Sequence, residues 1–490
     1  MRFKDFRVAP LTPGEIKLFT SWMMLRMGSL DERTLVVGLL VCFALLTTCF
    51  LGTNEGPRFA LSLSLGIHGE WHIERFFPDV IYPLFPSMDF VGKDDHIYNG
   101  KGPLLSILGA PIVYALWSIG ADLQLSVYLT TILLVGLPTA LTALLMVRFG
   151  RSIHRSGDVD PSVVALAYAL CTPAFFYSTV FYSYSIAALL AFASFMLVHR
   201  PRWGGMQDAV VAGALAGLVG LADYVTVLFF PGLLLYCYLK RPGWTFPFLV
   251  AGGTILSLLL VYSWLLLGDP FGLPFKYHGP FAGSDHGFYY TLGPPTPTAL
   301  LGLTLGPSRG LFFYSPVLIV AAVLLSRLRR RLSDEVLFIV SLSVLVIVVN
   351  AANASWWAGT AFGPRYLVAA MPFFVLPLFT VRREGRLWLV FTFLLLSSFL
   401  INLLGAASFY PESDANPVGG LVEEWIGGHY QVMQRSNRPP YEIITNRPKV
   451  HILFYRIGGV ADELLIRVPT ALAFVVGLAL FGRATSRHQA

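Results

Sequence analysis

The chain has 490 residues, of which 55% are hydrophobic and only 13% are charged, and its formal net charge is +7. Soluble globular proteins carry about 25% charged residues, so this composition excludes an ordinary soluble enzyme and indicates a surface that faces lipid. The basic residues stand in short clusters between apolar runs, as the positive-inside rule places them, and this pattern argues against a nucleic-acid partner.

The apolar runs predict an all-α polytopic membrane protein, because about 20 apolar residues are enough to cross a bilayer. We expect about 12 transmembrane helices, with a range of 11–13. A basic segment, residues 1–33, precedes the first run, and no small-residue cleavage site follows that run, so we expect a cytoplasmic or interfacial N-terminus that is retained. The expected spans are 34–52, 124–147, 161–178, 180–198, 208–222, 223–239, 244–267, 311–326, 336–352, 366–380, 387–404 and 467–482.

A thirteenth apolar run, residues 103–120, is treated differently because of charge. If it crossed the membrane, every later basic turn would change sides. If it is a re-entrant or interfacial helix, six basic clusters share the side of the N-terminus, as the positive-inside rule requires. These clusters are Arg148–Arg155, Arg200 with Arg202, Lys240 with Arg241, Arg327–Arg331, Arg382–Arg386, and Arg483 with Arg487.

This topology divides the chain into a membrane module at 34–404, an outer loop at 52–123 within it, an extracytoplasmic loop or small cap at 405–466, and a last span with a cytoplasmic tail at 467–490. It implies a multi-pass protein of the cytoplasmic (inner) membrane with its site facing the periplasm or outside. The four cysteines fall inside apolar runs without ligand spacing, which indicates neither a zinc site nor disulfides.

The outer loop gathers acidic and basic residues in a chain that is otherwise poor in them. Glu55 follows the first span, where a carboxylate next to lipid is costly and usually functional, and it could act as a general base. Lys101 precedes Gly102 and Pro103 at the start of the 103–120 helix, where a cation suits a phosphate. The alternatives are a solvated loop for the acidic residues and lipid head-group anchoring for Lys101.

Later outer turns add cations and aromatic residues. Arg309 and Arg365 each precede a span, and Trp357 lies near Arg365 in the chain, so they form either an anion pocket or an interfacial anchor. Asp223 interrupts an apolar stretch and is either a polar turn or a carboxylate of the site. The loop histidines, including His96, lack the spacing of metal ligands. A divalent metal held by carboxylates and water is an alternative that nothing in the sequence supports.

Several motifs resemble the GT-C superfamily of membrane glycosyltransferases, in particular bacterial relatives of the protein O-mannosyltransferases and of the lipid A aminoarabinose transferase. The segment N-E-G-P-R-F at 54–59 is similar to their Asp-Glu-x-x-Arg-Tyr motif, and Asp89 through Pro103 is similar to their D…G-x-x-Y-x-x-K-x-P signature. CTPAFFYSTVFYSYS at 171–185, PSRGLFFYSP at 307–316 and FGPRYL at 362–367 are similar to further segments of the family.

The resemblance implies a fold and roles for individual residues. A carboxylate after the first span would be the base, here Glu55, or Asp89 or Asp95, because Asn54 stands where the family has Asp. The donor phosphate would be bound by Lys101, Arg58, Tyr98, Arg309 and Arg365. Further substrate contacts are expected from His96, Tyr177, Tyr184, Asp223 and Trp357, although Tyr184 stands where relatives often have His.

The resulting hypothesis is an inverting glycosyltransferase that uses a polyprenyl-phosphate sugar and acts on a glycan, lipid or protein acceptor. No cofactor is indicated beyond this donor, and the partners are membrane lipid, donor and acceptor. The alternatives are a lipid-linked glycan ligase or polymerase, a transporter or flippase of polyprenyl-linked sugars, and a non-enzymatic assembly subunit. A transporter would be expected to show inverted repeats and charges near mid-membrane, whereas here the charges lie in outer loops.

Overall fold

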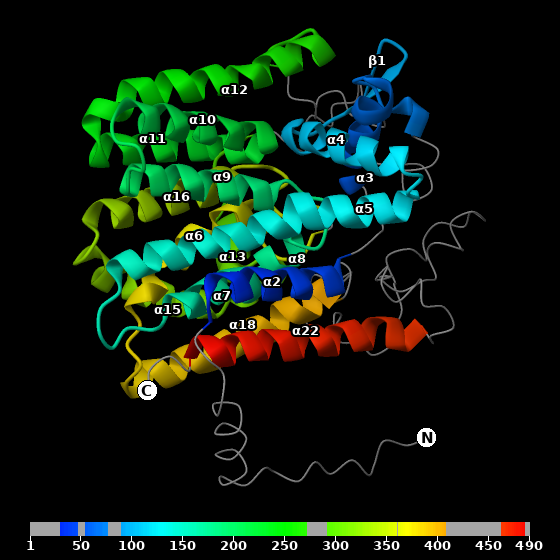
Figure 1. Ribbon diagram of the computed structural model, residues 1–490. Coiled ribbons are helices and arrows are strands. Elements are labelled where there is room, and N and C mark those ends of the chain that lie inside the picture. Colours follow the sequence, from blue (N-terminus) through cyan, green and yellow to red (C-terminus); the bar gives the residue numbers. More distant parts are fainter. Residues whose placement is uncertain are drawn as a thin grey trace.

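A computed structural model shows a bundle of helices that run roughly side by side (Figure 1). The structure describes residues 30–47, 54–76, 90–271, 292–359, 361–407 and 462–485. Five helical segments are long and apolar enough to cross a membrane: Leu123–Ile153, Pro242–Leu267, Ser333–Ala351, Gly385–Ala407 and Val468–Thr485. Together with six shorter apolar helices, they confirm an all-helical polytopic membrane protein; the count of about 12 spans stays a prediction.

The elements follow the chain in this order. The first half contains α2 (Glu32–Leu46), α3 (Glu55–Leu63), η1 (Ser64–His68), η2 (Glu74–Phe76), β1 (Phe90–Lys93), β2 (His96–Asn99), α4 (Leu104–Ser118), α5 (Leu123–Thr131), η4 (Ile132–Gly136), α6 (Leu137–Ile153), α7 (Pro161–Leu170), α8 (Ala174–Tyr177), α9 (Tyr184–His199) and α10 (Met206–Ala222). The second half contains η5 (Tyr224–Leu228), α11 (Phe229–Lys240), η6 (Pro242–Trp244), α12 (Thr245–Leu267), α13 (Pro297–Thr304), α14 (Leu311–Tyr314), α15 (Val317–Arg329), α16 (Ser333–Ala351), η10 (Arg365–Ala370), α17 (Met371–Phe374), η11 (Leu376–Thr380), α18 (Gly385–Ala407) and α22 (Asp462–Thr485).

Short polar side chains start several of these helices. Asp31, Asp122 and Asp160 accept hydrogen bonds from backbone N–H groups in the first turns of α2, α5 and α7. Such caps satisfy N–H groups that have no partner inside the helix. Pro161 follows its cap at the first helical position, where the missing N–H costs nothing.

The outer surface of the bundle is apolar, as expected for contact with lipid. In the most apolar stretch of α12, and likewise of α18, only 28% of the residues are buried inside the protein. Large side chains such as Phe246, Leu265 and Phe393 are therefore exposed. Exposed apolar surface on this scale has no place in water and is what a bilayer accommodates.

Glycines bring α10 and α12 into backbone contact. A Cβ on Gly217 would collide with the carbonyl oxygen of Gly252, and a Cβ on Gly252 would lie 2.6 Å from the carbonyl oxygen of Gly213. Gly213 and Gly217 are four residues apart, which is the small-xxx-small pattern of tightly packed membrane helices. The two helices lie along one another in the green part of the ribbon (Figure 1).

The expected helix at 366–380 is wrong in detail. The segment consists of three short pieces, η10, α17 and η11, which include Pro372 and Pro377. Proline removes a backbone donor and clashes with the preceding turn. All residues from Arg365 to Thr380 are buried, so the irregular backbone is enclosed by protein rather than exposed to lipid. The expected span at 311–326 is likewise broken, between α14 and α15, at Ser315 and Pro316.

The described basic turns meet at one end of the bundle. Glu32 accepts from Arg148 at 2.9 Å and from Arg151 at 2.5 Å, and the hydrogen bond from Arg148 contributes most to lowering the Glu32 pKa. Further contacts join the remaining turns: Arg331 to Asp158, Arg383 to Gly157 and Thr485, Arg241 to Val198, and Lys240 and His199 to Glu335. These contacts place the described clusters at one end of the bundle; their shared side of the membrane stays a prediction.

The outer loop contains a two-stranded antiparallel hairpin that the all-α expectation did not include. β1 and β2 pair with Phe90 opposite Asn99 and Lys93 opposite His96. Asp94 and Asp95 form the turn with φ values of 52° and 63°. Two consecutive left-handed residues match the twist of a tight hairpin, and Asp tolerates this conformation better than most side chains.

The 103–120 run forms α4, a helix of 15 residues. At 1.5 Å per residue it is about 22 Å long, which is less than the hydrocarbon thickness of about 30 Å. Its last turns expose Tyr114 and Trp117, residues typical of the membrane interface. The re-entrant or interfacial assignment stays a prediction, because α9, which runs between the two ends of the bundle, has only 16 residues itself.

Candidate functional site

Helix α3 begins with Glu55 and carries Arg58 one turn later. Both side chains are buried, with 2% and 1% of their surfaces exposed. Ser106 on α4 donates to the Arg58 carbonyl oxygen at 2.8 Å, so α3 is held against α4. The carboxylate that follows the first span therefore lies inside the protein, on a helix with a fixed orientation.

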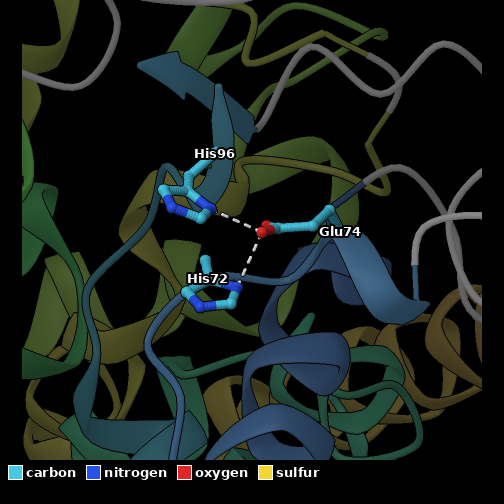
Figure 2. A group of neighbouring side chains, drawn as sticks. All are labelled: His72, Glu74 and His96. Atoms are coloured by element: carbon cyan, nitrogen blue, oxygen red, sulfur yellow. Dashed lines mark hydrogen bonds and ion pairs between the residues drawn. The ribbon is translucent and has the colours of Figure 1, made fainter. Parts of the chain in front are cut away.

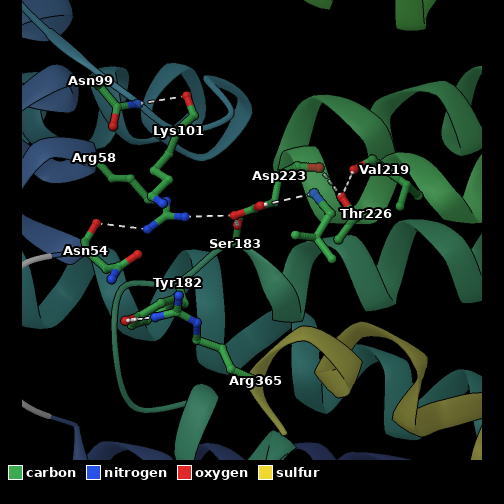
Figure 3. Close-up of polar contacts among 11 residues, drawn as sticks. Asn54, Arg58, Asn99, Lys101, Tyr182, Ser183, Val219, Asp223, Thr226 and Arg365 are labelled. Atoms are coloured by element: carbon green, nitrogen blue, oxygen red, sulfur yellow. Dashed lines mark hydrogen bonds and ion pairs between the residues drawn. The ribbon is translucent and has the colours of Figure 1, made fainter. Parts of the chain in front are cut away.

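Arg58 makes a buried ion pair with Asp223. Its Nη2 lies 2.8 Å from Asp223 Oδ2, and its Nη1 donates to the Asn54 carbonyl oxygen at 2.8 Å (Figure 3). Asp223 caps η5 through the Val225 N–H and also accepts from Ser183 at 3.3 Å. Asp223 was expected to be either part of a polar turn or a carboxylate of the site. It fits both descriptions, because it caps η5 and pairs with Arg58, a predicted site residue.

Lys101 lies next to this turn through its neighbour Gly102. A Cβ on Gly102 would lie 2.6 Å from the Ala222 carbonyl oxygen and 2.7 Å from that of Leu221. Only glycine allows the two backbones to approach so closely. Lys101 is buried, and its carbonyl oxygen accepts from Asn99 at 3.1 Å. Figure 3 shows the Lys101 side chain extending toward Arg58 and Asp223.

Tyr182 lies between two guanidinium groups. The Arg58 guanidinium carbon is 5.3 Å from the centre of the Tyr182 ring, and that of Arg365 is 5.8 Å from it. Both distances suit cation–π contacts. Sequence reasoning did not select Tyr182, although it lies in the segment 171–185 that resembles the family.

Arg365 is a buried cation without a carboxylate beside it among the described residues. Its one side-chain hydrogen bond to a described residue runs from Nη1 to the Tyr182 hydroxyl at 3.4 Å, and its Nε is buried without a partner among those residues. The guanidinium also lies over the Tyr366 ring, 5.3 Å from its centre. Burying a charge without a counter-charge costs on the order of several kcal/mol. Such a cation therefore usually binds an anionic ligand.

Arg309 is engaged by backbone carbonyl groups. It donates to the carbonyl oxygens of Trp357, Ser308 and Gly359, each at 2.7 Å. These bonds tie two loops together, and Trp357 takes part through its backbone while its ring packs edge-on against Trp356. Arg309 and Trp357 are thus placed near each other, as their predicted shared pocket requires.

Tyr177 and Tyr184 are fully buried beside Tyr182. Tyr184 stacks on Tyr182 with 5.7 Å between ring centres, and Tyr177 packs edge-on against both. The Tyr177 hydroxyl donates to the Phe362 carbonyl oxygen at 3.1 Å. The three tyrosines therefore form one buried aromatic group, and the Arg58 and Arg365 guanidinium groups lie over its Tyr182 ring.

The other predicted site residues lie elsewhere or outside the described part. Asp89 is outside the described residues. Asp95 is exposed at the hairpin tip, where its left-handed backbone conformation forms part of the turn. Tyr98 is half-buried on β2, and its pKa is raised by burial and by the charges of Glu74 and Asp94. The structure does not bring Asp95 into the buried group.

His96 belongs to a second cluster that linear spacing did not reveal. The Nδ1 atoms of His96 and His72 lie 2.6 and 2.7 Å from the same Glu74 oxygen (Figure 2). Burial opposes ionisation of Glu74, but hydrogen bonds from His96 and the Ile97 N–H hold its pKa below the ordinary value. The three side chains meet because the segment 72–74 pairs with β2, a contact that no motif spacing encodes.

The fold and the site together define a polytopic, all-helical membrane protein with a buried group of charged residues at the end of the bundle opposite the basic turns. The 16 residues of α9, which begins at Tyr184 and ends at His199, separate the two ends by about 24 Å.

Two solved structures resemble the chain: ArnT from Cupriavidus metallidurans bound to undecaprenyl phosphate, with 17% identity and a TM-score of 0.48, and ArnT from the same organism in the apo state, with 15% identity and a TM-score of 0.45. The alignments cover 95% and 96% of this chain and 78% of each ArnT chain. No family model and no curated protein matches the sequence. Similarity at this level does not assign the chain an activity or a ligand.

Proposed function

We propose that the protein is a glycosyltransferase of GT-C type that moves a sugar from a polyprenyl-phosphate donor to an acceptor on the extracytoplasmic face of the membrane. The observation that carries the proposal is the buried cation Arg365, which has no carboxylate beside it among the described residues and lies with Arg58 over the Tyr182 ring (Figure 3). The motifs at 54–59 and 89–103 support the same class.

A lipid phosphate fits this group for electrostatic reasons. Among the described residues the group holds four cations, Arg58, Lys101, Arg309 and Arg365, and two carboxylates, Glu55 and Asp223. A guanidinium presents a planar set of donors that matches phosphate oxygens, and a buried site strengthens each contact. The prenyl tail of such a ligand would remain among the apolar helices.

The proposed reaction is a single inverting displacement. Glu55 takes the proton of the acceptor hydroxyl, whose oxygen then forms a bond to the anomeric carbon. The bond between that carbon and the phosphate oxygen breaks, and its electron pair leaves with the polyprenyl phosphate. Lys101 and Arg365 stabilise the charge that develops there, so the leaving group needs no proton.

Other residues of the group would position these three. Arg58 has its charge offset by Asp223, so it would orient α3 and the Tyr182 ring rather than carry the phosphate. Arg309 would hold the loop at Trp357 against the loop at Ser308 through its carbonyl contacts. Asp89 and Asp95 remain alternative bases in the proposal, with Glu55 favoured because it is buried within the group.

The direct test uses full-length protein in proteoliposomes with a radiolabelled sugar on undecaprenyl phosphate and an envelope extract as acceptor. We expect label to move to the acceptor and free undecaprenyl phosphate to appear. Glu55→Gln and Lys101→Ala should each reduce the rate by about 10²–10³, as loss of a charge contact at a transition state typically does.

Arg330→Met is the matched control, because Arg330 is exposed at the basic end of the bundle. Near-normal transfer by both site variants would contradict the assignment of these residues. Movement of intact labelled lipid across the bilayer without transfer of the sugar would instead favour a flippase.

A further inference from the structure

The outer loop contains three side chains whose ligand atoms converge on one point. These atoms come from His72, Glu74 and His96, and all lie within 4.8 Å of one another. His72 and His96 stack with 4.5 Å between ring centres, and each directs Nδ1 toward Glu74 Oε1 (Figure 2). The side chains are partly exposed, so a cation in solution can reach them.

The backbone fixes this arrangement. His72 bridges to Tyr98, and the Ile73 N–H donates to the Ile97 carbonyl oxygen at 2.7 Å, so residues 72 and 73 lie beside β2 just before η2 begins at Glu74. Glu74 follows directly and is held beside β2 by His96 Nδ1 at 2.6 Å and by the Ile97 N–H at 3.2 Å. The three side chains therefore meet on one face without any need for the chain to reorganise.

The contacts within the cluster resemble those of a metal site before the ion enters. His72 Nδ1 lies 2.7 Å from the Glu74 oxygen, yet it makes no hydrogen bond of good geometry with any described residue. Tetrahedral ligands at about 2.0–2.2 Å from a zinc ion are about 3.3 Å apart, so an opening of less than about 1 Å would admit the ion.

The outer contacts of the cluster also fit a metal. The Ile97 N–H donates to Glu74 Oε2 at 3.2 Å, which leaves Oε1 directed at the histidines. On the far side of His72, Nε2 lies 3.8 Å from Glu70, and Arg75 holds Glu70 through bonds of 2.9 and 3.2 Å. At 3.8 Å the Glu70 carboxylate adds negative charge beside His72 but makes no hydrogen bond to it.

We propose that His72, Glu74 and His96 bind one divalent transition-metal ion of the zinc type, with water in the remaining position. Two imidazoles and one carboxylate are a common zinc ligand set. The ion would join the segment after η1 to β2, five residues before Lys101, and so would stabilise the outer loop. This proposal does not depend on the glycosyltransferase proposal.

The test measures metal alone on the full-length protein in detergent, purified on a tag without histidine. After treatment with a chelator and its removal, wild type should bind one Zn²⁺ per chain, and Co²⁺ should give the intense visible absorption of a four-coordinate site. Zn²⁺ should also raise the melting temperature, and chelator should reverse the rise. The melting temperature and the Co²⁺ spectrum report on binding independently of any activity.

The variants separate this site from others. His72→Ala and His96→Ala should each weaken Zn²⁺ binding by more than about 100-fold, because each removes one of the three protein ligands. His68→Ala is the matched control, because His68 belongs to the same loop but packs against Phe76. Absence of stoichiometric Zn²⁺ from wild type, or equal binding by wild type and the double variant His72→Ala/His96→Ala, would overturn the proposal.

Discussion

At the scale of single residues, Arg365 makes the clearest demand for a ligand. Its guanidinium is buried over two tyrosine rings, and in the described part of the chain one hydrogen bond of 3.4 Å is all that it donates. Hydrogen bonds to charged groups contribute about 1.5–3 kcal/mol each, and a guanidinium has five N–H donors with which to make them. An anion that enters the site would complete its contacts.

This demand predicts a difference between two substitutions. Arg365→Met should weaken binding of undecaprenyl phosphate at least about tenfold, because a charged hydrogen bond is lost. Arg365→Lys should lose less, since the charge stays and only the planar geometry is gone. Binding can be followed by tryptophan fluorescence, with undecaprenol as the uncharged ligand. Equal affinity of wild type and Arg365→Met for the phosphate would contradict a phosphate contact.

The Arg58–Asp223 pair predicts a stability effect. Asp223→Ala leaves a buried guanidinium without its partner, which typically costs about 3–5 kcal/mol. Removing both charges, as in Arg58→Met/Asp223→Leu, should restore much of this loss. The melting temperature in detergent measures both effects. A double variant as unstable as Asp223→Ala would mean that the pair is not what stabilises the turn.

At the scale of elements, the contact between α10 and α12 depends on glycine. Gly217→Leu places a side chain against the backbone of α12, so we expect a loss of about 1–3 kcal/mol or more from overpacking. Gly253→Leu is the matched control, because a Cβ there meets nothing within 4 Å. Thermal unfolding in detergent should separate the two variants. Similar melting temperatures would show that the helices can move apart at no cost.

The helices that the sequence predicts well are those with a continuous apolar run and no internal break. The expected runs at 208–222 and 244–267 correspond closely to α10 and α12. The runs at 311–326 and 366–380 were predicted as spans but form short pieces, because hydrophobicity does not distinguish burial in lipid from burial in protein. The hairpin was missed since its turn uses Asp-Asp rather than the Asn-Gly or Asp-Gly that marks such turns.

The site residues that could be predicted are charged residues next to apolar runs, where placing a charge is costly whatever its neighbours are. Glu55 and Arg365 stood out as charges next to apolar runs, and both are buried. Tyr182 and the His72–Glu74–His96 cluster were not predicted, because their significance comes from contacts between distant segments. Arg58 was expected to bind phosphate, and its pairing with Asp223 could not be read from positions 165 residues apart.

At the scale of the whole molecule, the basic turns and the candidate site lie at opposite ends of the bundle. The basic turns are joined to one another by ion pairs with Glu32, Asp158 and Glu335, whereas Glu55, Lys101 and Arg365 lie beyond the other ends of the same helices. The positive-inside rule then predicts that the basic end faces the cytoplasm and the charged site faces outward. A lipid-linked donor would be used only on that outer side.

Cysteine accessibility tests this orientation directly. In a background without the native cysteines, Gly92→Cys places a thiol on the exposed hairpin, where a Cβ meets nothing within 4 Å, and Arg330→Cys places one at the exposed basic end. A membrane-impermeant maleimide added outside the inner membrane should label Gly92→Cys at once and Arg330→Cys only after the membrane is opened. The reverse order would place the site in the cytoplasm, where the proposed outward-facing transfer could not take place.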